Sequence, residues 1–185
     1  MNSELIMSDS KKSKVTLRPV CDRDSNTIYT WQQDPRVRRY FHNPAAPEPG
    51  EHATWFNWRK NLSSGYFFII EFENMPSGVV RLDEIGFGQM EISIFVDPSM
   101  TRRGIASATL KQVRQLSPFA ELRANILPGN NASQLLFTQN DYVYDDATLS
   151  YLSRPEVDGL PVALCPDGGA NVGLGHAMRC CALAD

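Results

Sequence analysis

Three strand-like runs in close succession restrict the folds open to this chain more than any other feature. Residues 65–73 are rich in aromatic and β-branched side chains, and residues 78–85 follow them after the turn sequence Asn-Met-Pro-Ser-Gly. Residues 89–96 come next, after Gly-Phe-Gly, and Asp97 and Pro98 end the run. Strand-forming runs separated by such short turns predict an antiparallel meander.

Helices and further strands are expected around this meander. The expected strands are residues 15–20, 120–127 and 142–152, and the expected helices are residues 22–31, 50–62, 101–116 and 129–140. Ile105, Thr109 and Val113 recur at helical spacing in the third helix. The order of elements predicts an α+β domain built on one central mixed, mostly antiparallel sheet flanked by helices.

The chain of 185 residues divides into four expected parts. Residues 1–14 are polar and predict a disordered tail, and residues 15–152 carry the domain. Residues 153–160 form a polar linker. Residues 161–185 predict a short apolar strand, a glycine-rich turn and the start of a helix.

Composition argues against several classes of function. A formal net charge of −3 supplies no basic field for nucleic acid, and no apolar run is long enough to span a membrane. The three histidines are dispersed, so no metal site is expected. The four cysteines form no CxxC pair, which favours a reducing, cytoplasmic location; they are Cys21, Cys165, Cys180 and Cys181.

A glycine beside two arginines marks the junction between the third meander strand and the next helix. The start of a helix leaves backbone N–H groups unpaired and carries partial positive charge. Gly104 has no side chain to block an approaching anion, and Arg102 and Arg103 add positive charge. The junction is therefore either an ordinary helix start or a cradle for a pyrophosphate.

Two motifs in the same order resemble the GNAT superfamily of acetyl-coenzyme A-dependent N-acetyltransferases. The first is the hexapeptide 101–106, Thr-Arg-Arg-Gly-Ile-Ala, which matches the family's pyrophosphate loop. The second matches the family's later Asn-x-Ala-Ser pattern and consists of Asn130, Ala132, Ser133, Leu136, Phe137, Asp141 and Tyr142. The resemblance covers about residues 15–152.

The resemblance implies the GNAT-like acyl-CoA N-acyltransferase fold and acetyl-coenzyme A as acetyl donor. It also implies a bulged strand before the loop that is splayed from its neighbour, with the donor's pantetheine arm pairing with the backbone of residues 94–96. The implied donor-binding residues are Ile94, Phe95, Val96, Thr101, Arg102, Arg103, Gly104, Ile105, Ala106, Ser107, Asn130, Ser133 and Phe137.

Two residues depart from the family pattern. Thr101 stands where the family has Gln or Arg, and Phe137 stands where many members have a tyrosine that protonates the leaving thiolate. Tyr142, Ser133 or water could replace that tyrosine, or the domain could be slow or inactive. Helical spacing places Ala132, Leu135 and Leu136 on a buried ridge and turns Phe137 toward the site.

Acetyl transfer to an amine also needs a group that accepts the ammonium proton. Glu91 lies on the strand that leads to the loop and is the expected base, with Asp83 and Glu84 as alternatives. An exposed strand carboxylate without a catalytic role is the competing interpretation. Tyr40, Phe41 and Glu84 are expected to contact the acceptor, whereas most other aromatic residues of the first two helices are expected to pack in the core.

Further resemblances point to one acceptor. Residues 31–41 and 51–56 resemble the N-acetyltransferases of pseudaminic acid synthesis, and residues 161–185 resemble the first residues of that pathway's UDP-sugar hydrolase. The chain would then acetylate the 4-amino group of a UDP-linked amino-dideoxy sugar, and residues 161–185 would be only the truncated N-terminal part of a second enzyme.

Two alternative functions are left open. The first is acetylation of protein N-termini, including those of ribosomal proteins, and the second is a non-catalytic module that binds coenzyme A or a nucleotide sugar. The sequence also leaves open whether the chain forms a homodimer.

Overall fold

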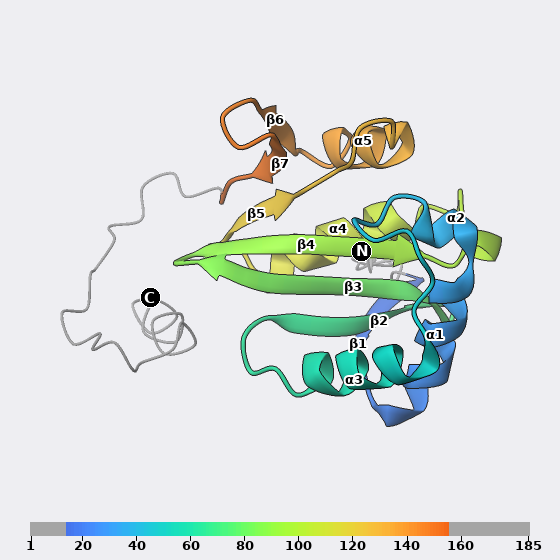
Figure 1. Ribbon diagram of the computed structural model, residues 1–185. Helices are drawn as coiled ribbons and strands as arrows, with labels where there is room; N and C mark the ends of the chain where they lie inside the picture. The colour runs from blue at the N-terminus through green and yellow to red at the C-terminus, as the bar shows by residue number, and fades with distance from the viewer. Residues whose placement is uncertain (1–13, 156–185) are drawn as a thin grey trace, which may run out of the picture.

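The computed structural model describes residues 14–155, and within them one seven-stranded sheet organises the chain (Figure 1). The order across the sheet is β1-β2-β3-β4-β5-β7-β6, in which only β4 and β5 are parallel neighbours. The strands are β1 (Val15–Pro19), β2 (Tyr66–Phe72), β3 (Met75–Gly86), β4 (Gln89–Val96), β5 (Glu121–Ala124), β6 (Val143–Asp145) and β7 (Ser150–Ser153).

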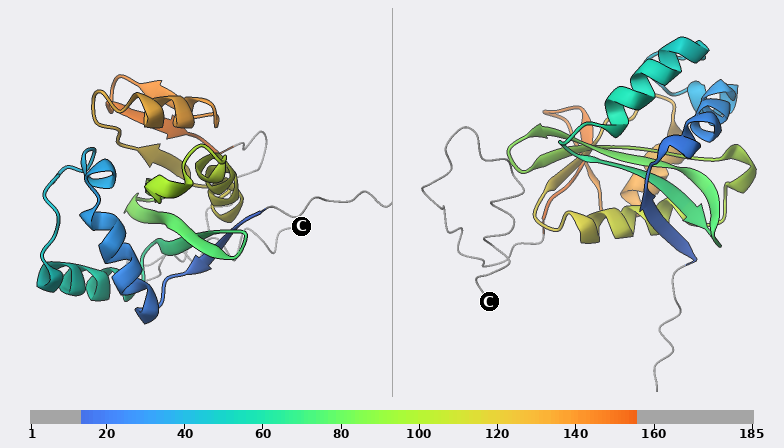
Figure 2. Two further views of the ribbon diagram at one scale, coloured as in Figure 1. Left: turned by 90° about the vertical axis from the view of Figure 1, so that its right-hand side faces the viewer. Right: turned by 90° about the horizontal axis from the view of Figure 1, so that it is seen from below.

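Helices cover both faces of this sheet. Figure 2 shows α1 and α3 on one side and α4 on the other. The α-helices are α1 (Ser25–Gln33), α2 (Pro35–Arg38), α3 (Pro49–Lys60), α4 (Ile105–Leu116) and α5 (Asn131–Thr138), and the short 3₁₀ turns are η1 (Asp22–Asp24) and η2 (Pro98–Met100). The expected α+β architecture on one mixed sheet is confirmed. The expected tail of residues 1–14, the linker beyond Pro155 and the segment 161–185 fall almost wholly outside the described residues.

The alternation of side chains along the strands creates two apolar cores. Met90 and Ile92 of β4 pack with Val113 of α4 in the larger core. Phe95 packs on the opposite side, against the smaller core around Trp31 of α1. Successive residues of a strand point to opposite faces, so alternate residues of β4 belong to the two cores.

The meander of β2, β3 and β4 is confirmed, but its first turn is shorter than expected. The turn consists of Glu73 and Asn74, both with positive φ, and β3 already begins at Met75. Pro76 is tolerated because the register between β2 and β3 shifts beside it. The register shifts beside Glu71 on β2 and between Glu84 and Gly86 on β3. From Met90 to Val96, β4 pairs regularly with β3, so the bulge expected in β4 is not seen in this pairing.

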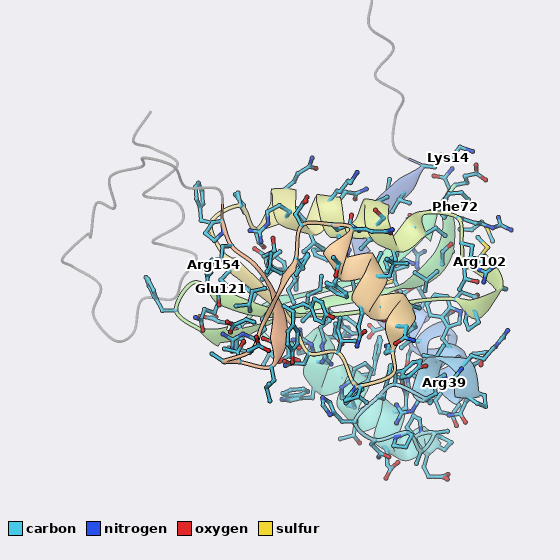
Figure 3. All side chains as sticks on the ribbon, turned by 90° about the horizontal axis from the view of Figure 1, so that it is seen from above. Lys14, Arg39, Phe72, Arg102, Glu121 and Arg154 are labelled. Atoms are coloured by element: carbon cyan, nitrogen blue, oxygen red, sulfur yellow. The ribbon has the colours of Figure 1, made fainter. Side chains whose placement is uncertain are left out.

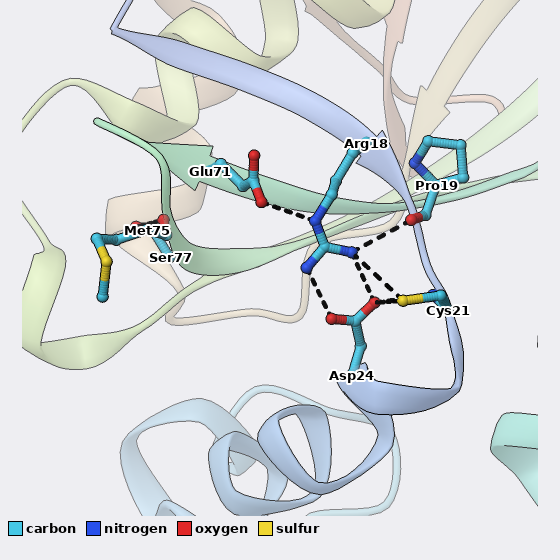
Figure 4. Close-up of polar contacts among 7 residues, drawn as sticks. All are labelled: Arg18, Pro19, Cys21, Asp24, Glu71, Met75 and Ser77. Atoms are coloured by element: carbon cyan, nitrogen blue, oxygen red, sulfur yellow. Dashed lines mark hydrogen bonds and ion pairs between the residues drawn. The ribbon is translucent and has the colours of Figure 1, made fainter.

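An ion cluster fixes the end of β1 to the first helical turn (Figure 4). Both terminal nitrogens of Arg18 donate to the Asp24 carboxylate at 2.7 Å, and its Nε donates to Glu71 at 2.7 Å. The backbone N–H of Cys21 also donates to Asp24, at 2.8 Å. These contacts set where α1 starts and therefore where it lies over the sheet.

One expectation about α5 is wrong. Phe137 is the buried residue of this helix, at 3% exposure, whereas Leu135 is 59% exposed and Ala132 is also exposed. Leu136 alone of the expected ridge packs against the larger core. The helix is rotated so that the Phe137 ring meets Tyr142 edge-on, with 4.9 Å between ring centroids. The local spacing was compatible with either orientation, and contact with Tyr142 selects this one.

Within residues 14–155, no helix has the length and apolar character that crossing a membrane requires.

Candidate functional site

A gap between β4 and β5 is the central feature of the site. The two strands pair only from Gln89↔Glu121 to Glu91↔Arg123, and β4 continues to Val96 without β5 beside it. Figure 1 shows β5 diverging from β4 toward their carboxyl ends. The backbone of residues 92–96 is therefore open to an added extended chain on that side, as expected for a pantetheine arm.

The helix that follows β4 begins at the wide end of this gap. Gly104 adopts a left-handed conformation, with φ +74°, and nothing lies within 4 Å of the position that a Cβ would occupy. The first helical hydrogen bond runs from the Ala108 amide to the Gly104 carbonyl, so the amides of residues 105–107 come before it. No side chain caps the helix among the described residues. This is an open cradle with the donors that a pyrophosphate needs, so the residues fit the expected acetyl-coenzyme A.

The charged rim of the cradle is formed by exposed side chains. Arg102 and Arg103 are both exposed, and Arg102 has a positive φ of 61°. The Thr101 hydroxyl donates to the Pro98 carbonyl at 3.3 Å, so it stabilises the loop. The helix begins at Ile105 and not at residue 101 because Gly104 breaks the helical conformation.

Several predicted donor-binding residues have structural partners. The Asn130 side chain accepts from the Ser133 amide at 3.2 Å and thereby caps α5. The Ser107 hydroxyl donates to Asn140 at 2.8 Å, which links α4 to the end of α5. Ile105 is buried in the larger core, so only its backbone faces the cradle. These three side chains are already engaged within the protein, so Asn130, Ser107 and Ile105 would contact a donor mostly through their backbone groups.

The structure places Phe137 and Tyr142 in the core. Tyr142 is 4% exposed, and its hydroxyl has no hydrogen-bond partner within the described residues. Burial raises the pKa of Tyr142, which makes its hydroxyl a weaker proton donor. Ser133 is half-buried on α5. The side chain of Phe137 does not point to the site, contrary to expectation.

Two of the predicted bases, Glu91 and Asp83, have different surroundings. Glu91 is half-buried at the narrow end of the gap, and its Oε2 accepts from Asn125 Nδ2 at 2.8 Å. Asp83, its partner across β3 and β4, is instead held by ion pairs with Arg59 and Arg81. Each of the two carboxylate oxygens of Asp83 therefore lies against a guanidinium group.

The prediction that Glu84 contacts the acceptor with Tyr40 and Phe41 does not agree with the pleat of the sheet. Glu84 pairs with Met90, which belongs to the core on the α4 side. Cross-strand partners share one face. Phe41 contacts Phe95, which faces the α1 side, so Glu84 lies on the other face.

Tyr40 and Phe41 follow α2 and contact residues on both sides of the gap, before α5 and on β4. The Tyr40 hydroxyl donates to the Gly129 carbonyl at 3.2 Å, at the entrance to α5. The Phe41 ring lies 6.2 Å from the ring of Phe95 on β4. Arg39 is exposed, and its guanidinium lies 5.0 Å over the Tyr40 ring. Figure 3 shows Arg39 and Arg102 at one end of the molecule and Glu121 at the other.

The remaining aromatic residues support this arrangement. The Trp31 indole donates to Asp97 at 2.9 Å, which ties α1 to the segment just after β4. His52 is buried, and its ring nitrogens contact Gln32 and the Ser25 carbonyl at 2.9 Å. Trp58, in contrast, is exposed and is not one of the aromatic residues that pack in a core.

Sequence reasoning missed Asn125, the partner of Glu91. A polar residue directly after a strand, at the carboxyl end that flanks the gap, was the signal that could have revealed it. Within residues 14–155, no group of three or more His, Cys, Asp or Glu side chains is placed to hold a metal ion.

Comparisons with known proteins agree with this geometry. A family model described as an acetyltransferase (GNAT) domain matches residues 14–143. No curated protein sequence matches the chain.

Solved structures with this fold act on several kinds of amine. The chain is similar to RimL, a ribosomal L7/L12 alpha-N-protein acetyltransferase in complex with coenzyme A, with 14% identity, a TM-score of 0.68, and coverage of 78% of this chain and 96% of that one. It is also similar to spermidine N-acetyltransferase from Vibrio cholerae in complex with CoA and spermine, with 18% identity, a TM-score of 0.64, and 71% and 82% coverage. A third is aminoglycoside acetyltransferase AAC(6')-Ib in complex with coenzyme A and kanamycin, with 14% identity, a TM-score of 0.63, and 76% and 94% coverage. At these identities the likeness establishes the fold.

Proposed function

Because this chain belongs to the GNAT acetyltransferase family and uses acetyl-coenzyme A as acetyl donor, we propose that it acetylates the 4-amino group of a UDP-linked amino-dideoxy sugar. The observation that carries the choice of acceptor is the Arg39–Tyr40 pair beside the gap. The exposed guanidinium of Arg39 can bind the diphosphate of a UDP-sugar, and the Tyr40 ring offers an aromatic surface on which the nucleobase can stack.

The charge of the same segment argues against polycationic acceptors. Arg36, Arg38 and Arg39 lie within four residues of one another. Arg36 is paired with Asp34 at 2.6 Å, and Arg38 donates to the Asn43 and Ala45 carbonyls, but Arg39 and its charge are exposed. Spermine and kanamycin carry several positive charges and would be repelled here, whereas a UDP-sugar is attracted.

The sequence of the neighbouring segments supports the same acceptor. Residues 31–41 and 51–56 resemble the N-acetyltransferases of pseudaminic acid synthesis, and residues 161–185, which lie outside the described part, resemble the start of that pathway's UDP-sugar hydrolase. A homodimer and a cytoplasmic location remain predictions.

In the proposed reaction, acetyl-coenzyme A supplies the activated acetyl group as a thioester. The amides of residues 105–107 and the guanidiniums of Arg102 and Arg103 hold its phosphates. Tyr40 and Arg39 orient the acceptor, and Glu91 takes a proton from its ammonium group. Orientation of the neutral amine supplies much of the rate acceleration.

A competition among four amines tests the proposal. The purified chain is assayed by mass spectrometry with acetyl-coenzyme A and a UDP-4-amino-4,6-dideoxy sugar, a Ser-initiated peptide, spermine or kanamycin. We expect the UDP-sugar to have the highest kcat/KM, and Arg39→Ala to raise its KM about 10-fold without changing that of the donor. Arg23→Ala, a change at an exposed arginine of η1, is the matched control and leaves both KM values unchanged.

If the Ser-initiated peptide has the highest kcat/KM, the proposal of a sugar acceptor is wrong and protein N-termini are the substrates. If the chain does not bind acetyl-coenzyme A, it is a non-catalytic module.

A further inference from the structure

Asn125 closes the narrow end of the gap by reaching back to β4. It is the first residue after β5, and its Nδ2 donates to Glu91 Oε2 at 2.8 Å. Glu91↔Arg123 is the last pair of the β4–β5 ladder. The hydrogen bond therefore joins the two strands at the point where they start to separate, and it leaves Glu91 Oε1 available.

Glu91 lies on the face of the sheet where the acceptor is proposed to bind. Its neighbours Met90 and Ile92 point into the core on the α4 side, so Glu91 points the opposite way. Phe95, four residues further along β4, lies on that same face and contacts Phe41. The carboxylate and the acceptor-binding segment thus flank the gap from one side.

The charged groups that face Glu91 come from three elements. Asp83 on β3 is its cross-strand partner, and it is held by Arg81 on the same strand and by Arg59 on α3. Arg123 on β5 is its other cross-strand partner and donates to Glu121 at 3.3 Å. These charges pair mainly with one another, whereas Glu91 pairs with the neutral amide of Asn125.

We propose that Asn125 is a positioning residue for Glu91, which rests on the proposed function of Glu91 as the base. The amide orients the carboxylate by donating a hydrogen bond to one of its oxygens. The other oxygen takes a proton from the acceptor ammonium. The neutral nitrogen then bonds to the acetyl carbonyl carbon, the carbon–sulfur bond breaks, and the departing thiolate takes the second proton from nitrogen.

The separation of kcat from KM tests this role. Asn125→Ala removes the contact that orients the Glu91 carboxylate, so kcat falls about 10-fold while the KM of the acceptor stays unchanged. The affinity for acetyl-coenzyme A stays unchanged. Asn57→Ala, at an exposed asparagine of α3, is the matched control and moves neither quantity. Glu91→Gln lowers kcat about 100-fold or more, which checks the base itself.

A double-mutant cycle separates the positioning role from the assignment of the base. If Asn125 acts through Glu91, Asn125→Ala lowers kcat about 10-fold in the wild-type chain and causes no further loss in Glu91→Gln. An equal further loss in the Glu91→Gln background would overturn the positioning role. Normal turnover by Glu91→Gln would instead overturn the assignment of the base.

Discussion

Asp24 shows how a single side chain connects three parts of the fold. Its carboxylate accepts two hydrogen bonds from Arg18 on β1 and one from the Cys21 backbone, just before α1 (Figure 4). Burial by itself would raise the pKa of Asp24, but the hydrogen bonds from Arg18 and Cys21 outweigh it and lower the pKa from 3.8 to about 2. A carboxyl with a lowered pKa stabilises the folded state while it is ionised.

Loss of this carboxylate is expected to remove stability at neutral pH. Asp24→Asn lowers the free energy of unfolding at pH 7 by about 2 kcal/mol, since the pKa shift sets the size of the effect. In the wild type the same contribution is present above pH 4 and is lost as the pH falls toward 2. Urea denaturation at pH 7 and pH 2 measures both. Asp22→Asn, whose side chain is 83% exposed, is the control, and an equal loss in that variant would contradict the assignment.

Tyr142 illustrates the opposite case, a polar atom buried without a partner. Its hydroxyl contributes no hydrogen bond within the described residues, so Tyr142→Phe removes only a desolvated group. We expect unchanged or slightly higher thermal stability and unchanged kcat, measured by calorimetry and by the transfer assay. A 10-fold or larger loss of kcat with unchanged stability would restore Tyr142 as the proton donor.

At the scale of elements, the start of α4 is the proposed binding site for the phosphates of the donor. Its amides face outward because Gly104 ends the loop in a left-handed conformation with no side chain in the way. The gap between β4 and β5 opens at the same end, so one helix terminus and one strand edge are placed for a single extended ligand.

Filling the cradle is expected to abolish binding of acetyl-coenzyme A. Gly104→Val weakens affinity about 100-fold or more in calorimetric titration and removes the increase in Tm that the ligand causes. Gly88→Val is the matched control, because Gly88 also has positive φ and open space around its Cβ position but lies in the turn between β3 and β4. Both variants lose about 1–2 kcal/mol of stability through backbone strain. Equal loss of affinity in both would place the phosphate site elsewhere.

At the scale of the whole molecule, the two faces of the sheet carry different tasks. The α4 face is packed by the larger core and carries the start of α4, where the phosphates of the donor are proposed to bind. The α1 and α3 face carries the smaller core, the proposed acceptor-binding segment and Glu91. The splayed pair β4–β5 is the only place in the described sheet where parallel neighbours part, so donor and acceptor can meet there from opposite faces.

The amino-acid sequence by itself determined the order of the main helices and strands and the three-stranded meander. These depend on local properties: β-branched and aromatic runs, short turns and helical spacing. The sequence also marked Gly104 as a position without a side chain and predicted Glu91 as the base, but it placed the start of the helix at residue 101, expected one strand where β6 and β7 form an antiparallel pair, and missed the partner of Glu91.

Only the tertiary structure decided which face each residue of α5 presents and which carboxylate remains available. Phe137 is buried because Tyr142 lies against it, and Asp83 is occupied because α3 brings Arg59 over the sheet. Asn125 meets Glu91 because two parallel strands separate just beyond them. Each of these outcomes joins residues far apart in the chain, and local spacing carries no information about such contacts.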